Sequence, residues 1–198
     1  MAERRLPALQ RFIDAMRGLY TEPLEPADRF EKARPLLKAL LADPELSERS
    51  KGWPSGSDHA NNDYVNLLFY EDPDYGFAIN ALVKDPGEKT PIHDHAHTWT
   101  LYGVLEGGEK VVRYRRTDDR VSEEQATLRL IGAHDVSPGY IDFVPPYEVH
   151  AEYNGDARTV GVIVRSEKVS GFLQNWYDAD TGAIEKHYGP RQVPYELV

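Results

Sequence analysis

The stretch TPIHDHAHTWTLYGVLEGGE, residues 90–109, decides the fold, because three of its first eight residues are histidines. The apolar run TWTLYGVL within it is typical of a β-strand. Residues two apart in a strand point to the same face, so His93 and His95 can present two imidazoles to one point inside a barrel. Imidazole suits iron, zinc, copper and nickel, and two such groups need a third. The stretch therefore predicts part of a metal site.

Glycines and prolines stand at fixed distances from these histidines. Gly87 lies six residues before His93, and Gly107 follows His95 further along the chain. A second group of residues, further along the chain, has a fixed spacing of its own and contains Tyr147 between its proline and its histidine. The members of this second group are Gly139, Pro145, His150 and Asn154.

These two groups resemble, in the same order, the two sequence motifs of the cupin superfamily, except that Tyr147 stands where the second motif has a further glycine. The resemblance covers roughly residues 64–166 and implies a jelly-roll barrel, also called a double-stranded β-helix. Thr100 stands where many cupins carry a glutamate as a fourth ligand, so the implied metal shell consists of three neutral histidines. The ligands that the resemblance implies are His93, His95 and His150.

The rest of the chain agrees with a barrel preceded by helices. Residues 1–50 place apolar side chains at helical spacing, and Pro35 is expected to bend or delay the second helix. Residues 48–62 are rich in Ser, Gly, Asn and Asp and predict a loop. Residues 64–198 contain short apolar runs bounded by turn residues, including a hairpin turn at DADTG, residues 178–182. The predicted fold class is all-β, a cupin jelly-roll barrel with an N-terminal helical segment packed on it in a single structural domain.

Composition excludes several classes of protein. The 198-residue chain has a net charge of −10, which argues against binding to nucleic acid or to anionic membranes. It contains no cysteine, so disulfides, cysteine-ligated zinc and cysteine nucleophiles are excluded. No apolar segment approaches the length of a membrane span or a signal peptide. We therefore expect a cytoplasmic protein with neither nucleic-acid nor membrane partners, and edge-strand pairing would allow a homodimer.

The three-histidine shell and residues 90–109 resemble the cysteine dioxygenase family and its bacterial relatives. This resemblance implies a mononuclear non-haem Fe(II) enzyme whose partners are O2 and a small organic substrate, most simply a mercapto-acid oxidised to a sulfinate. Three neutral ligands leave the charge of Fe(II) uncompensated and positions open, so an anionic chelating substrate would displace water. Zinc, nickel or copper can occupy such a site in the purified protein.

Some features of that family are missing here. Asn66 stands nearest to the position of the family's carboxylate-binding arginine, and residues 163–167 lack its histidine and tyrosine. Thr100 replaces the cross-linking cysteine of the animal enzymes. Arg165 is then a candidate carboxylate anchor, since guanidinium binds a carboxylate through two parallel hydrogen bonds. Alternatively, Arg165 ends a strand and either pairs with Glu167 or faces solvent.

Four further side chains are candidates for the site. Arg113 is a second candidate for substrate binding, although two neighbouring arginines favour a solvated face. Thr100 and Tyr102 lie two residues apart and can share the inward face, where Thr100 would contact substrate and Tyr102 would hydrogen-bond substrate or dioxygen. Tyr102 alternatively belongs to the core. His97 is interpreted as a catalytic or pocket-lining residue, or as a structural one, because the strand is expected to bend before it.

Three other histidines are interpreted as residues without a role in the metal site. His59 and His134 are assigned to loops, His59 with an entrance role as the alternative, and His187 to the tail hairpin.

Three other functions stay open from the sequence. The same metal site would serve a dioxygenase that cleaves a carbon–carbon bond of a diketone or hydroxylated ketone. A metal-binding cupin without turnover would act as a small-molecule sensor or binding module. An isomerase or lyase with another metal is disfavoured by Thr100, because many such cupins retain the glutamate.

Overall fold

The computed structural model describes residues 5–55 and 65–197. Its helices each begin with proline, which suits the first helical position because the N–H it lacks would be unsatisfied there. The Asp43 side chain also caps the third helix by accepting hydrogen bonds from the next turn. None of the helices in the described ranges has the length and apolarity needed to cross a membrane. The helices are α1 (Pro7–Thr21), α2 (Pro26–Leu41) and α3 (Pro44–Ser50).

Two sequence expectations about this region need correction. α2 begins at Pro26 and continues through Pro35, so the expectation that this proline delays the helix is wrong. Burial of the apolar face of α2, which includes Phe30 and Leu37, compensates for the hydrogen bond that Pro35 removes. α3 also extends into the segment predicted as a loop, whose residues 56–62 lie outside the described ranges.

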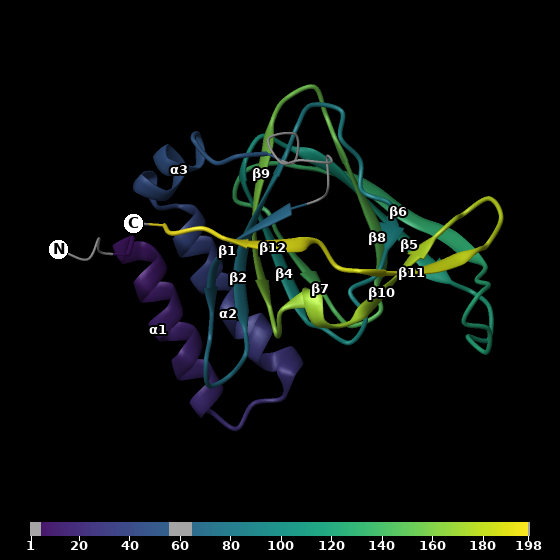
Figure 1. Ribbon diagram of the computed structural model, residues 1–198, viewed down its shortest axis with the longest axis horizontal. Coiled ribbons are helices and arrows are strands. Elements are labelled where there is room, and N and C mark those ends of the chain that lie inside the picture. The colour runs from purple at the N-terminus through teal and green to yellow at the C-terminus, as the bar shows by residue number, and fades with distance from the viewer. Residues whose placement is uncertain (1–4, 56–64, 198) are drawn as a thin grey trace.

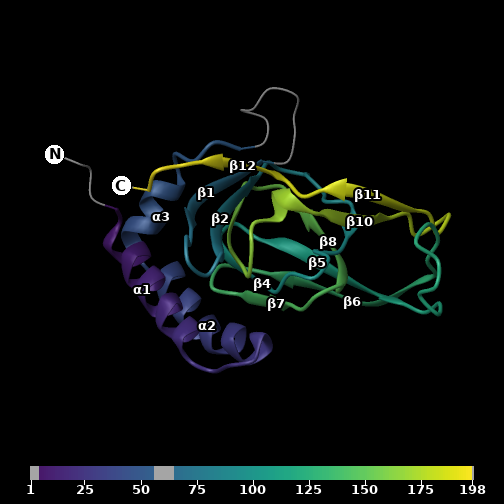
Figure 2. The ribbon, with the colours of Figure 1, turned by 60° about the horizontal axis from the view of Figure 1, so that its bottom comes forward.

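Within the described residues, twelve strands form two six-stranded sheets that face each other (Figures 1 and 2). All neighbouring strands are antiparallel except the first and the last, which pair in parallel. The first sheet has the order β12 (Arg191–Pro194), β1 (Val65–Glu71), β2 (Ala78–Lys84), β9 (Thr159–Arg165), β4 (Thr100–Glu106) and β7 (Ile141–Val144). The second has the order β11 (Ile184–Tyr188), β10 (Leu173–Tyr177), β3 (Ile92–His93), β8 (Val149–Asn154), β5 (Glu109–Arg116) and β6 (Leu128–Val136). The predicted helices followed by a barrel of short strands are confirmed.

The helices cover the outer face of the first sheet (Figure 2). Alternate residues of β9 show this: Val162 and Val164 pack in the same core as the helices, whereas Ile163 faces the barrel interior. Gly103 on β4 makes the close approach of α2 feasible, because a Cβ there would lie 2.7 Å from Leu41 Cδ1. The outer face of this sheet is thus sealed, and its inner face is free to line a site.

Strand register places the candidate residues of both sheets around the barrel interior. In the second sheet His93 on β3 pairs with His150 on β8, and Trp176 on β10 pairs with His93 from the other side. In the first sheet Thr100 on β4 pairs with Arg165 on β9. The histidines and the arginine therefore belong to opposite walls of one barrel.

Candidate metal centre and its pocket

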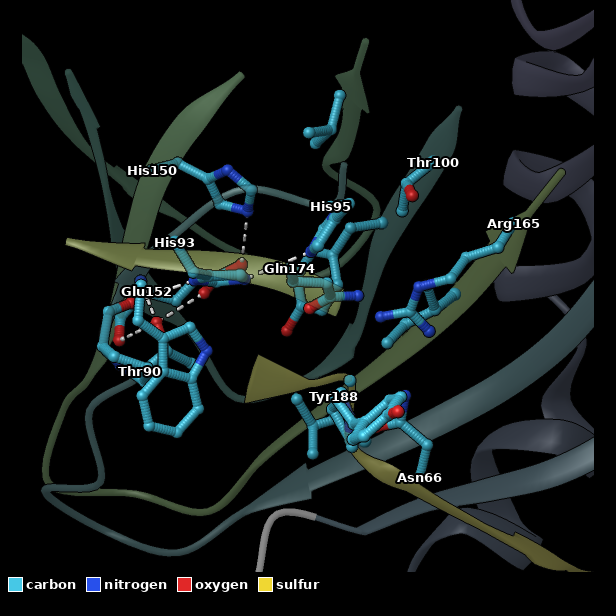
Figure 3. A pocket seen from close by; sticks show the side chains of 18 of the residues that line it. Asn66, Thr90, His93, His95, Thr100, His150, Glu152, Arg165, Gln174 and Tyr188 are labelled. Carbon is cyan, nitrogen blue, oxygen red and sulfur yellow. Dashed lines mark hydrogen bonds and ion pairs between the residues drawn. The ribbon is translucent and has the colours of Figure 1, made fainter. Parts of the chain in front are cut away.

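Three imidazole rings converge inside the barrel (Figure 3). His93 and His150 come from paired strands, and His95 follows the end of β3 by two residues. One ring nitrogen of each histidine lies within 4.8 Å of the others, and the Nε2 atoms of His93 and His95 are 3.1 Å apart. The structure therefore brings the three predicted ligands to one point.

Hydrogen bonds to backbone carbonyls fix the orientation of two of the rings. Nδ1 of His93 donates to the carbonyl oxygen of Pro91 at 2.9 Å, and Nδ1 of His150 donates to that of Glu148 at 3.0 Å. A carbonyl oxygen only accepts, so the proton is on Nδ1 and Nε2 carries the lone pair. Such bonds are typical of metal-binding histidines, because they hold the free nitrogen toward the ion.

Burial keeps the rings of His95 and His150 in the neutral form that binds metal. Burial, together with the neighbouring His150 and His93, holds the pKa of His95 well below its usual value. Burial and then His93 lower the pKa of His150 to about 3. Nε2 of His150 and Nδ1 of His95 are buried and have no hydrogen-bond partner in the part of the chain that the structure describes. This donor set fits a transition metal such as iron, zinc, copper or nickel without selecting among them.

Asp94, between the first two histidines, anchors the bend that brings His95 into the group. Its carboxylate accepts hydrogen bonds from the Tyr177 hydroxyl at 2.7 Å, from the Asn175 amide at 2.9 Å and from the Ala96 backbone N–H at 2.9 Å. Ala96 has a φ of +49°, so the chain leaves the strand conformation there. The expected bend is confirmed, but the role of Asp94 in fixing it went unnoticed in the sequence.

The three histidines open onto a cavity of about 460 Å³, a volume suited to a small organic molecule. Its walls are largely apolar and come from both sheets. Among the apolar lining residues are Leu82, Val144, Ile163 and Trp176.

Arg165 faces this cavity from the wall opposite the histidines (Figure 3). The residue is 4% exposed, and its Nε and Nη1 atoms have no hydrogen-bond partner in the described ranges. Burial lowers its pKa to about 10, against the opposing influence of Glu152, and the guanidinium stays charged at neutral pH. A buried cation without a partner is costly, so its position favours an anionic ligand in the cavity.

Two other candidates are engaged elsewhere, and the structure does not place them in the cavity. Arg113 pairs with Asp142 and Glu148, which satisfies its charge away from the lining. The His97 side chain is 53% exposed, and its Nε2 lies 2.6 Å from Glu167. The expected roles of Arg113 as a substrate anchor and of His97 as a catalytic or pocket residue therefore find no support in this arrangement, in which other partners hold both side chains.

Thr100 and Tyr102 do line the cavity, as their shared parity on β4 predicts. Burial, followed by the charge of Glu109, raises the pKa of Tyr102 well above its usual value, so the phenol stays protonated. Its hydroxyl has no hydrogen-bond partner among the described residues. Gly161 on β9 leaves the space that the ring fills, since a Cβ there would lie 2.4 Å from the ring. Lys84, whose Nζ lies over the ring at 5.2 Å from its centre, pairs with Glu109.

Glu152 also lines the cavity, and sequence reasoning missed it. It lies two residues after His150 on β8, and its Oε1 is 3.6 Å from His150 Nε2. Burial acts to raise its pKa, but Lys84 and two of the histidines outweigh burial and lower the pKa to about 2. The sequence does contain a signal for this residue: Glu152 is two residues from His150, just as His95 is two residues from His93, and residues two apart in a strand share a face.

The remaining histidines lie outside the metal group. His134 belongs to β6, not to a loop, and its Nε2 is 3.0 Å from the Tyr140 hydroxyl. His187 lies on β11, in the tail hairpin that the sequence predicted. His59 lies outside the described residues.

No family model matches the chain. Among solved structures, it is similar to an oxalate oxidase in complex with glycolate, at 20% identity and a TM-score of 0.37 over 46% of this chain and 42% of that one. The cupin domain of Schizosaccharomyces pombe Cnp3 matches at 12% identity and a TM-score of 0.40, over 52% of this chain and 64% of that one. A protein with a double-stranded β-helix domain from Klebsiella pneumoniae matches at 17% identity and a TM-score of 0.39, over 58% and 88%.

The chain thus spans less than two thirds of the oxalate oxidase and of the Cnp3 cupin domain. The last two of these three solved structures are described as a cupin domain and as a double-stranded β-helix domain. The strand orders of the two facing sheets form the jelly-roll barrel that the sequence motifs predicted. Inside this barrel, the three-histidine cluster is consistent with a metal site.

Proposed function

We propose that the protein is an Fe(II)-dependent dioxygenase that oxidises a small mercapto-acid to a sulfinate. The supporting observation is that a buried, unpartnered guanidinium, that of Arg165, shares one cavity with the three histidines. A carboxylate on Arg165 would recover the hydrogen bonds that the guanidinium lacks. The other end of a small substrate would then reach the histidine wall.

The reaction R–SH + O2 → R–SO2H is balanced without a further reductant, since both oxygen atoms enter the product. Fe(II) held by the three histidines would supply the redox chemistry that joins thiol and dioxygen. The protein itself has to bind and orient the substrate and keep water out of the cavity. The apolar walls, such as Leu82 and Ile163, exclude water, and Arg165 fixes one end of the substrate.

Tyr102 is proposed to hydrogen-bond the reacting end of the substrate. Its hydroxyl is buried beside the Glu109 carboxylate and makes no hydrogen bond of good geometry within the described ranges, and its raised pKa keeps the proton in place. It therefore offers a donor to a sulfur or oxygen atom instead of a negative charge. Thr100, opposite Arg165 in register, offers a second unpartnered hydroxyl near the carboxylate end.

Oxygen uptake by the Fe(II)-loaded protein tests this function. The protein is loaded anaerobically, and uptake is compared for a short mercapto-acid, the mercapto-alcohol of equal length and a β-diketone. We expect uptake with the mercapto-acid, both atoms of isotopically labelled dioxygen in the sulfinate product, and no uptake by His150→Ala. Arg165→Gln should raise KM for the mercapto-acid at least about 10-fold and leave that for the mercapto-alcohol nearly unchanged.

Other outcomes select the alternatives. Uptake with the diketone alone would replace the proposal with carbon–carbon bond cleavage by the same site. A protein that binds iron but shows no uptake with any of the three compounds would contradict the thiol dioxygenase and favour a binding role.

A further inference from the structure

The cavity contains an acidic group that the sequence motif lacks. Thr100 stands at the position from which many cupins supply a carboxylate, but Glu152 places one beside the histidines from a different strand. Because Glu152 lies two residues after His150 on β8, both side chains point to the same face. The Glu152 residue is 8% exposed, and Figure 3 shows its carboxylate on the histidine side of the cavity.

The contact between Glu152 and His150 brings together two acceptors. Nδ1 of His150 donates to the Glu148 carbonyl, so its Nε2 carries a lone pair. The Glu152 Oε1 atom, which is also an acceptor, lies 3.6 Å from that Nε2. A carboxylate oxygen and a bare imidazole nitrogen repel each other unless a cation attracts both. A metal ion held by the histidines would be that cation.

Thr90 holds the carboxylate in place and leaves one of its oxygens available. The Thr90 hydroxyl donates to Glu152 Oε2 at 2.8 Å and accepts from the Glu152 backbone N–H at 2.8 Å. The Thr90 backbone N–H donates to the Glu152 carbonyl at 2.9 Å. Oε2 is therefore engaged, while Oε1 faces the histidine that carries the free lone pair.

We propose that Glu152 is the fourth protein ligand of the metal held by His93, His95 and His150. It flanks the three-histidine group on the His150 side, where its Oε1 lies 3.6 Å from His150 Nε2. Its carboxylate is not within 4.8 Å of all three histidine nitrogens, so it would turn toward the ion on binding. The centre would then carry one positive charge from a divalent ion instead of two. This proposal rests on the metal site of the proposed function and on no particular substrate.

Titration of metal-free protein with Co(II), followed by visible absorption, tests the proposal without any turnover. The intensity and position of the Co(II) bands report the ligands and the coordination number, and the titration gives the Kd. We expect Glu152→Gln to weaken Co(II) binding at least about 10-fold and to change the bands. Glu152→Asp, which keeps a carboxylate, should retain more affinity than Glu152→Gln.

Glu167→Gln is the matched control, because it removes the same charge from a side chain that pairs with His97 outside the cavity. It should keep the wild-type bands and a Kd within about two-fold of wild type. Glu152→Gln with wild-type Kd and bands would overturn the ligand role while leaving the three-histidine site intact. Equal weakening by both glutamine variants would also overturn it, since the effect would then be one of overall charge. Failure of wild type to bind Co(II) would remove the metal site itself.

Discussion

Thr100 on β4 lies directly opposite Arg165 on β9, and both side chains are buried against the same cavity. The Thr100 hydroxyl and the Arg165 Nε and Nη1 atoms have no hydrogen-bond partner within the described parts of the chain. Unsatisfied buried donors are destabilising, and an unpaired charge more so. These unpaired groups therefore lower the stability of the folded protein, and a bound anion would offset that loss.

Arg165→Met is expected to stabilise the protein. The change keeps an apolar chain of similar length and removes the buried charge, so the free energy of unfolding should rise by about 1–3 kcal/mol. Urea unfolding of the metal-free protein measures this. A mercapto-acid should raise the unfolding midpoint of wild type but not of the variant. A variant less stable than wild type would show that Arg165 is satisfied in the folded protein.

Metal-free protein should lose stability on mild acidification. The pKa of His150 is lowered from 6.5 to about 3, and that of His95 is also well below 6.5, so the unfolded chain binds more protons below pH 6.5. Their contribution is fully present above pH 6.5 and is lost as the pH falls toward 3. Between pH 7 and 5 we expect a loss of up to about 2 kcal/mol for His150 and a further loss in the same direction for His95.

Urea unfolding at pH 7.0 and 5.0 measures this loss. Glu152 does not interfere between pH 7 and 5. Its pKa is lower in the folded protein than the value of 4.5 in the unfolded chain, so its stabilising contribution is lost only as the pH falls below about 4.5. His150→Gln should show a smaller difference between the two pH values than wild type. Equal unfolding midpoints for wild type at both pH values would refute the assignment of neutral, buried histidines.

The fold and the three-histidine cluster could be predicted because the signals for them are local, with His150 added by the motif resemblance. Strand period and motif spacing are local properties, so they indicate which side chains share a face and where turns fall. Partners from distant strands are not encoded locally. The pairing of Arg113 with Asp142 joins β5 to β7, and no pattern in the sequence of β5 predicts it. For the same reason the sequence alone does not decide whether the Arg165 side chain faces the cavity or the solvent; the position of β9 in the barrel does.

His97 should contribute nothing to metal binding. Although it continues the alternation of His93 and His95, the chain bends at Ala96 and turns its ring toward Glu167 and Phe172. His97→Ala is expected to keep the wild-type Kd for Co(II) within about two-fold, because an exposed ion pair contributes little. His93→Ala, the matched change two positions from His95, should abolish tight binding. A clear loss of affinity in His97→Ala would return His97 to the site.

Gly161→Ala should destabilise the barrel through Tyr102. A Cβ at Gly161 would lie 2.4 Å from the Tyr102 ring, and a ring packed between two sheets has little freedom to move. We expect a loss of about 1–3 kcal/mol in the free energy of unfolding, measured with urea. Gly132→Ala on β6 is the control, because a Cβ there meets nothing within 4 Å and should cost little stability.

Since Tyr102 lines the cavity, the Gly161 variant should also lower oxygen uptake, whereas the Gly132 variant should keep it. Equal stability of the two variants would mean that Tyr102 can move aside, and its hydroxyl would then have no fixed position from which to contact a substrate.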